Sequence, residues 1–505
     1  MIPGMTMPQL IVILCALLMG TLLAALDLSI VNTALPTIAG KLNGVSGYAW
    51  VGTSYILAST IAMPILGKLS DLYGRQRFFH ISIVIFLIAS LLCAGAQSIG
   101  QLIAARGLQG IGGGGIQAIT FAILGDLIAP RERGRYIGLY VAAHTVAGIG
   151  GPLVGGFIVD RWSWPWVFLI NLPIGVVALG ASMWQLRLPF QRRKTRLDLL
   201  GAALLTSGLF CLMLGLEEGR KGWGEGRVFA LFVAAMALLG GFLLQERRAV
   251  EPMIPLTLFR NGVVANIYLV SVLIGAAVFG SNIFLPLFFQ DARGVSPTRS
   301  GLYLIPQLLG SLFGTIIVGR LIAKTGRYKR SGIVACVVAI LGFAGIARIH
   351  ANVSYASLAV PLLLAGLGTG AIFTISSVAM QNAIQRSDRP GDMGVATATQ
   401  VFFRSLGGSI GLAIFGSVFT ARVTSSVTAR LGSDVKVSKL IRDPRAIAKL
   451  DGPSRHAIAV GLGSGTRTVF IVVVAILLVL FVVLQRLREL PLLSGTPSPE
   501  AASGH

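Results

Sequence analysis

The stretch Gly67-Lys-Leu-Ser-Asp71-Leu-Tyr-Gly74-Arg75-Gln-Arg77 decides the fold, because it recurs as Gly319-Arg-Leu-Ile-Ala323-Lys-Thr-Gly326-Arg327-Tyr-Lys329. Gly, Leu, Gly and Arg keep their spacing at an offset of 252 residues, and Ala323 takes the place of the carboxylate. A glycine-rich stretch at 110–114 is likewise echoed at 366–370. Two similar units in parallel orientation would produce this repeat.

The composition is that of a polytopic membrane protein. Of the 505 residues, 54% are hydrophobic and only 12% are charged, with a mean hydropathy of +0.80, too few charges for a soluble surface. Apolar runs of about 17 to 25 residues, the length needed to cross about 30 Å of hydrocarbon, predict fourteen helices. We expect them near 9–32, 48–67, 78–97, 101–124, 136–158, 165–186, 199–216, 228–246, 263–290, 301–323, 331–348, 356–380, 396–421 and 467–485.

The repeat and the helix count together predict an all-α fold of two six-helix bundles with two inserted helices. We expect a first bundle over 1–186, a linker with the inserted helices over 187–262, a second bundle over 263–490 and a disordered tail over 491–505. The first apolar run is too long for a cleavable signal, so we expect it to remain as a helix. The four cysteines fall inside predicted spans, which indicates apolar core thiols and no metal or disulfide site.

The net charge is +23, and the distribution of the basic residues agrees with the predicted topology. Basic residues gather in the loops on one side, which indicates that both termini lie in the cytoplasm. We expect the membrane to be the plasma membrane, the inner membrane of a cell with two. Because these residues are dispersed, we expect no nucleic-acid partner. The stretch 422–467, with nine basic residues on the opposite side, is either a basic external lobe or a place where the helix assignment fails.

Asp27 lies inside the first apolar run, where a carboxylate is costly and usually serves a proton or a cation. Arg106, one to two turns into the fourth span, falls at a similar depth. Burial disfavours a charged carboxylate and a nearby guanidinium stabilises it, so relative movement of the two could load or release a proton. Alternatively the two form a fixed ion pair that only aligns helices. For Arg106, a structural role and a coupling role both remain open.

Four motifs give the chain a family resemblance. They are Leu26-Asp27-Leu-Ser-Ile-Val-Asn32-Thr-Ala-Leu35-Pro36, the Gly67 to Arg77 loop, Arg106-Gly107-Leu-Gln109-Gly110, and Gly148-Ile-Gly-Gly151-Pro152-Leu-Val-Gly155-Gly156. Over nearly its whole length the chain resembles the fourteen-helix drug:proton antiporter family of the major facilitator superfamily. The resemblance implies a transporter and not an enzyme, driven by the proton gradient without a cofactor.

The resemblance also assigns conformational roles. The inner loop would stabilise the outward-open state, with Asp71 meeting a nearby arginine or a helix N-terminus of the second bundle; a purely topogenic role for the charges is the alternative. The motif in the fifth span would mark an exporter, by close glycine packing and a kink at Pro152; ordinary glycine packing is the alternative. The residues concerned are Gly67, Asp71, Gly74, Arg75, Arg77, Arg133, Gly148, Gly151, Pro152, Gly155 and Gly156.

Polar and aromatic residues in spans expected to face the centre are candidates for the remaining roles. His144 is either a proton relay or a neutral packed imidazole. Arg404 needs an anionic substrate group, Asp392 or a carbonyl as partner. Aromatic faces could stabilise an organic cation, although most such rings face lipid or neighbours. The candidate substrate-binding residues are Asn32, Tyr55, Gln109, Phe279, Asn282, Phe284, Phe288, Gln307, Phe373, Gln400, Phe402 and Arg404.

We therefore expect a monomeric proton-driven exporter of lipophilic small molecules working by alternating access in the bilayer. Members of the family that the chain resembles tend to carry an extra acidic residue in this region when they export divalent cations. The spans 263–290 and 301–323 contain none, so the resemblance favours monovalent cationic or neutral substrates. Export of a specific metabolite or lipid, and proton-coupled import, remain alternatives on the same fold. No P-loop sequence is present, so ATP is not the expected driving force.

Overall fold

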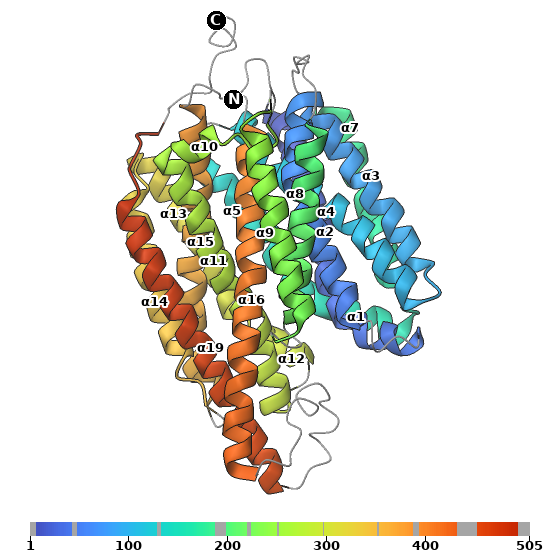
Figure 1. Ribbon diagram of the computed structural model, residues 1–505, viewed down its shortest axis with the longest axis vertical. Helices are drawn as coiled ribbons and strands as arrows, with labels where there is room; N and C mark the ends of the chain where they lie inside the picture. The colour runs from blue at the N-terminus through green and yellow to red at the C-terminus, as the bar shows by residue number, and fades with distance from the viewer. Residues whose placement is uncertain are drawn as a thin grey trace, which may run out of the picture.

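The computed structural model describes residues 7–42, 48–128, 133–186, 198–219, 224–249, 252–295, 297–350, 353–386, 393–431 and 452–492. Within these ranges all regular structure is helical, and fourteen spans are long and apolar enough to cross a membrane. The predicted fold class and number of spans are confirmed. The chain is an integral multi-pass membrane protein (Figure 1).

Six spans form the first bundle: α1 (Met7–Lys41), α2 (Tyr48–Tyr73), α3 (Arg75–Ala94), α4 (Ile99–Leu127), α5 (Arg133–Arg161) and the pair α6 (Trp166–Leu169) and α7 (Asn171–Gln185). The inserted helices are α8 (Leu199–Gly219) and α9 (Gly226–Glu246). The second bundle contains α10 (Thr257–Arg260), α11 (Gly262–Leu287) with the π-helical η2 (Phe288–Ala292), α12 (Pro297–Leu302), α13 (Ile305–Thr325), α14 (Lys329–Ile346), α15 (Tyr355–Gln385), α16 (Met393–Leu431) and α19 (Gly452–Arg486).

The sequence repeat corresponds to a repeat in packing. In α4, a side chain at Gly110 would overlap the backbone of Tyr55 in α2, and one at Gly112 would overlap the backbone of α3. In α15, Gly366 lies equally close to the backbone of α13, and Gly368 to that of α14. Each glycine stretch therefore brings its helix against two neighbours, in the same arrangement in both bundles.

Each of the repeated loops contains a glycine with positive φ. Gly74 joins α2 to α3 with φ 106°, and Gly326 ends α13 with φ 65°, both in the region that favours glycine. We call the membrane side on which these two loops lie the Asp71 side. On this side α1 begins and α19 ends (Figure 1).

The basic stretch 422–467 is helical at both ends of its described part, so the predicted bounds 396–421 and 467–485 are too short there. Helix α16 continues to Leu431 and α19 begins at Gly452, while 432–451 lie outside the described residues. Val423 and Val427, one turn apart, pack against Gly461 and Gly465 of α19. A hydropathy scan misses these extensions because polar residues occupy their other faces. In Figure 1 the pair projects beyond the other helices, on the side opposite the Asp71 side.

The inserted helices α8 and α9 pack on each other, and α8 contacts both α2 and α16. Asp198 accepts hydrogen bonds from the backbone N–H of Gly201 (2.9 Å) and from Gln245 Nε2 (3.1 Å), which joins the start of α8 to the end of α9. The Glu246 carboxylate accepts from the backbone N–H groups of Met253 (2.9 Å) and Ile254 (3.3 Å). These bonds anchor the segment that leads from α9 to the second bundle.

Candidate functional site

Asp27 lies at the centre of a fully buried polar network in the first bundle. Asp27 and Arg106 both have 0% exposure, and Arg106 Nη1 donates to Asp27 Oδ2 over 2.5 Å. The other carboxylate oxygen, Oδ1, accepts from Gln109 Nε2 (2.9 Å) and Asn171 Nδ2 (2.7 Å). The prediction that Asp27 and Arg106 share one depth is confirmed.

A second layer surrounds this ion pair. Gln109 Oε1 accepts from Arg106 Nη1 (2.6 Å), and Gln109 Nε2 also donates to Ser90 Oγ (2.8 Å). The guanidinium carbon lies 4.4 Å from the centroid of the Tyr55 ring. The network thus connects α1, α2, α3, α4 and α7. Arg106 and the amides of Gln109 and Asn171 all donate to Asp27, so protonation of Asp27 would weaken each of these contacts.

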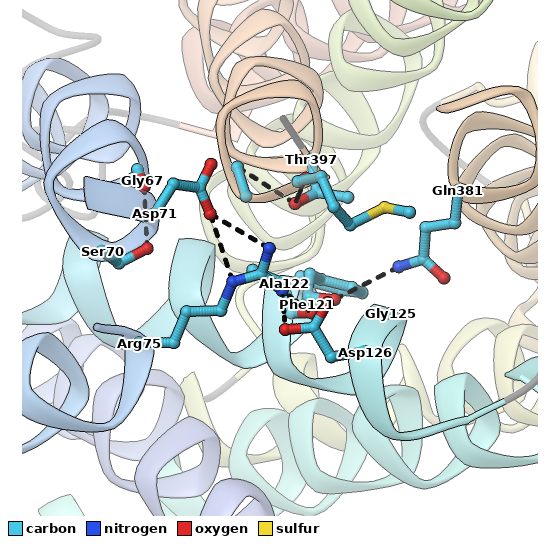
Figure 2. Close-up of polar contacts among 12 residues, drawn as sticks. Gly67, Ser70, Asp71, Arg75, Phe121, Ala122, Gly125, Asp126, Gln381 and Thr397 are labelled. Atoms are coloured by element: carbon cyan, nitrogen blue, oxygen red, sulfur yellow. Dashed lines mark hydrogen bonds and ion pairs between the residues drawn. The ribbon is translucent and has the colours of Figure 1, made fainter. Parts of the chain in front are cut away.

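A second charged cluster lies on the Asp71 side, within the first bundle (Figure 2). Arg75 Nη2 lies 3.0 Å from Asp71 Oδ1, and Nη1 forms an ion pair with Asp126 of α4. Arg75 Nη1 also donates to the carbonyl oxygen of Ala122 over 2.7 Å. The predicted pairing of Asp71 with a nearby arginine is confirmed for Arg75, and Asp126 joins it as an acid that the motif analysis did not include.

The same cluster joins the two bundles. The backbone N–H of Val395, in the first turn of α16, donates to Asp71 Oδ2 over 2.7 Å. A helix N-terminus carries partial positive charge, so this contact places the carboxylate where it is stabilised. Gln381 Nε2 of α15 donates to the Phe121 carbonyl (3.2 Å), as Figure 2 shows, and Gln385 to that of Gly125 (3.4 Å). The bundles are therefore closed against each other on the Asp71 side.

Glycines allow this closure. A side chain at Gly394 would overlap the Asp71 carboxylate, and one at Gly67 would overlap the side chain of Ala398. Arg77 is exposed, and the side chain of Arg133 lies outside the described residues. Within the predicted set, Gly67, Asp71 and Arg75 therefore lie at the contact between bundles.

The glycines of α5 pack mainly on α1. Gly151 lies against Ser29 and Gly155 against Ile30, whereas a Cβ atom at Gly148 would lie 3.5 Å from Leu308 of α13 across the bundle boundary. Gly156 faces open space. Helix α5 continues from Arg133 to Arg161, and the side chain of Pro152 lies outside the described residues. Close packing at this motif is confirmed for α1.

Between the bundles, Arg404 of α16 lies over aromatic rings. Its guanidinium carbon is 4.4 Å from the centroid of Phe373 (α15) and 5.9 Å from that of Phe121 (α4). Tyr140 (α5) stacks on Phe373 at 6.0 Å and 9°, and the His144 ring lies 4.5 Å from Tyr140. We call these five residues the ring cluster. It takes members from both bundles. Phe373 and Arg404 lie about two turns along α15 and α16 from the contacts that Gln381 and Val395 make on the Asp71 side.

Several predicted substrate-binding residues lie elsewhere. Phe284 and Phe288 are buried in the core of the second bundle, where they pack on Phe415, Phe419 and Phe289, so assigning them to a central site was wrong. Tyr55 and Gln109 belong to the Asp27 network instead.

The other candidates are distributed as follows. Asn32 is exposed on α1, while Gln307, Gln400 and Phe402 are buried. The backbone of Gln307 packs on α15, within the second bundle. Gln400 lies one turn before Arg404 on α16. The side chains of Phe279 and Asn282, and all of Asp392, lie outside the described residues.

Sequence reasoning missed residues that complete each cluster. Asn171 and Ser90 bind the Asp27 network, Gln381 and Gln385 cross the bundle boundary, and Tyr140 forms the middle of the ring cluster. Their shared signal is a buried polar or amphipathic side chain in an apolar span, since such groups need a partner. The partner's identity depends on helix rotation, which the sequence does not give.

Comparisons with known proteins agree with this architecture. The family model described as Major Facilitator Superfamily matches residues 17–412. The Multidrug resistance protein 3 of Bacillus subtilis (strain 168) is 34% identical over 86% of this chain and 85% of its own length. The Multidrug transporter protein MdtP of the same strain is 34% identical over 83% of this chain and 77% of its own.

A solved structure supports the same fold. The proton:xylose symporter XylE superposes with a TM-score of 0.64 at 14% identity, covering 95% of this chain and 96% of that one. With matching repeats, a matching family model and relatives that align over most of their length, the chain is a transporter that belongs to the major facilitator superfamily.

Proposed function

We propose that this transporter exports lipophilic small molecules in exchange for protons, with Asp27 as the proton-carrying group. The observation that carries the proposal is the fully buried Asp27–Arg106 ion pair. Protonation of Asp27 removes its attraction for the guanidinium, so it changes the contacts among five helices of one bundle. Such a change in contacts is what couples proton binding to a conformational equilibrium.

The contacts on the Asp71 side support alternating access. Asp71, Gln381 and Gln385 hold the bundles together at that end, and the ring cluster lies deeper, between the bundles. We propose that the Asp71 side is cytoplasmic, in keeping with its basic loops, and that this conformation is closed toward the cytoplasm. Opening would break these three contacts and expose the ring cluster.

The relatives named as multidrug proteins support export of several lipophilic compounds over a single nutrient. Of the two substrate classes favoured by the sequence, the monovalent cation fits the ring cluster poorly, because Arg404 already occupies the face of Phe373. We further propose that the transporter works in the plasma membrane as a monomer and without a cofactor.

The test uses purified protein in liposomes with an imposed pH gradient and a panel of lipophilic fluorescent dyes. We expect dye to move opposite to the protons, and Asp27→Asn to abolish the gradient-driven part while leaving a folded protein. Asp198→Asn is the matched control, because that carboxylate joins α8 to α9 away from the network. Full gradient-driven transport by Asp27→Asn would exclude this residue as the carrier, and dye movement in the same direction as the protons would make the protein an importer.

A further inference from the structure

The charge of Arg404 has no counter-charge within the described part of the chain. Its described contacts are the ring faces of Phe373 and Phe121, and no described carboxylate or carbonyl hydrogen bonds to it. A half-buried cation with ring faces as its main partners keeps unused N–H donors, and a guanidinium has five. Such a group at membrane depth usually has a functional partner.

The acids of the two bundles that the structure describes are engaged elsewhere. Asp27 binds Arg106 and two amides, while Asp71 and Asp126 bind Arg75 on the Asp71 side. A cationic molecule entering the ring cluster would therefore meet the like charge of Arg404 without an opposing carboxylate. An anionic group would supply the partner that Arg404 lacks.

A second donor lies on the same helix. Gln400 is 4% exposed, and its Nε2 has no hydrogen-bond partner among the described residues. Positions four residues apart lie on the same face of a helix, so the Gln400 amide and the Arg404 guanidinium are neighbours on α16. An amide N–H and a guanidinium together can bind two oxygens of one carboxylate or sulfonate.

The rings determine the rest of the ligand. Tyr140 and Phe373 are nearly parallel and come from opposite bundles, and Phe121 lies 4.4 Å from Tyr140. When the bundles separate, these faces lose each other as partners and become free to stack on a flat aromatic molecule. Resting on the proposed transport function, we propose that the ring cluster binds an aromatic organic anion, with Arg404 and Gln400 binding the anionic group.

The experiment compares three ligands that share one ring system: 2-naphthylacetate, its neutral amide, and 2-(2-naphthyl)ethylammonium. Equilibrium dialysis against protein in nanodiscs of neutral lipid measures the affinity of each without any gradient. We expect wild-type protein to bind the carboxylate at least about tenfold more tightly than the other two. In Arg404→Gln, the affinity for the carboxylate should fall by at least about tenfold, and the affinity for the amide by less than about twofold.

Two further variants separate the effect of the Arg404 charge from a general effect of substitution in α16. Arg404→Lys should retain part of the preference for the carboxylate, because it keeps the charge but not the paired donors. Arg422→Gln is the matched control, since this arginine is exposed on the same helix and should bind like wild type. Tighter binding of the ammonium, an unchanged carboxylate affinity in Arg404→Gln, or no saturable carboxylate binding would each overturn the proposal. Because the assay has no gradient, any of these results can occur while proton-driven transport is intact.

Discussion

At the scale of single residues, the buried Asp27–Arg106 pair depends on hydrogen bonds from neighbouring amides. Both side chains have 0% exposure, and the amides of Gln109 and Asn171 supply the donors that the second carboxylate oxygen needs. Removing one charge from a buried pair leaves the other without compensation, which costs more than removing both. The network is therefore expected to respond to substitutions in a strongly non-additive way.

We predict that Arg106→Gln lowers the free energy of unfolding by about 3–5 kcal/mol, because it leaves the Asp27 carboxylate buried without a cation. The double variant Asp27→Asn/Arg106→Gln should recover at least half of this loss, since it buries only amides. Thermal unfolding in detergent, followed by tryptophan fluorescence, measures both. If the loss of stability in the double variant equals the sum of the losses in the two single variants, the two charges do not interact energetically.

The sequence predicted this pair but not its full set of partners. Asp27 and Arg106 could be matched because each is a charge in an apolar span, and counting residues from the helix ends gave a common depth. Asn171 is uncharged, and whether α7 turns it toward α1 or toward lipid depends on tertiary packing. The same uncertainty in rotation explains why Phe284 and Phe288 were wrongly placed at the centre.

At the scale of helices, the contact of α2 with the first turn of α16 depends on Gly394. A Cβ atom there would overlap the Asp71 carboxylate, which accepts from the next backbone N–H group. The helix start itself was predicted to within three residues, at 396 against Met393. A helix N-terminus of the second bundle was predicted only as one of several possible partners of Asp71, because the sequence does not fix how the two bundles dock.

We predict that Gly394→Ala weakens closure on the Asp71 side by about 1–3 kcal/mol, the usual cost of inserting a methyl group into a packed contact. Spin labels at the exposed positions Arg77 (α3) and Arg330 (α14) should show a larger share of long distances by pulsed electron paramagnetic resonance. Gly416→Ala is the matched control on the same helix, because nothing lies near its Cβ position. An unchanged distance distribution in Gly394→Ala would mean that this contact does not hold the bundles closed.

At the scale of the whole molecule, the two bundles share a scaffold but differ in charge chemistry. Gly110 and Gly112 in one bundle correspond in packing to Gly366 and Gly368 in the other. Among the residues that the structure describes, the fully buried ion pair lies in the first bundle, and the half-buried Arg404, which has no described carboxylate partner, lies in the second. The repeated motifs predicted the common scaffold well, whereas the chemistry of each bundle follows from residues that do not repeat.

We predict that the Asp71 side faces the cytoplasm. In a cysteine-free background, Arg77→Cys should react with a membrane-impermeant maleimide only after cells are permeabilised, because its loop side carries the excess of basic residues. Thr424→Cys, exposed on the far extension of α16, should react in intact cells. The reverse pattern of labelling would invert the topology and, with it, the proposed direction of transport.

The extension of α16 beside α19 has a practical consequence. At about 1.5 Å per residue, the 39 residues of α16 reach about 58 Å, nearly twice the hydrocarbon thickness of about 30 Å. The far ends of the two helices are held together by Val423 and Val427 against glycines of α19. A transporter with little mass outside the bilayer is hard to align in electron micrographs, and this packed helical pair would serve as its own fiducial mark.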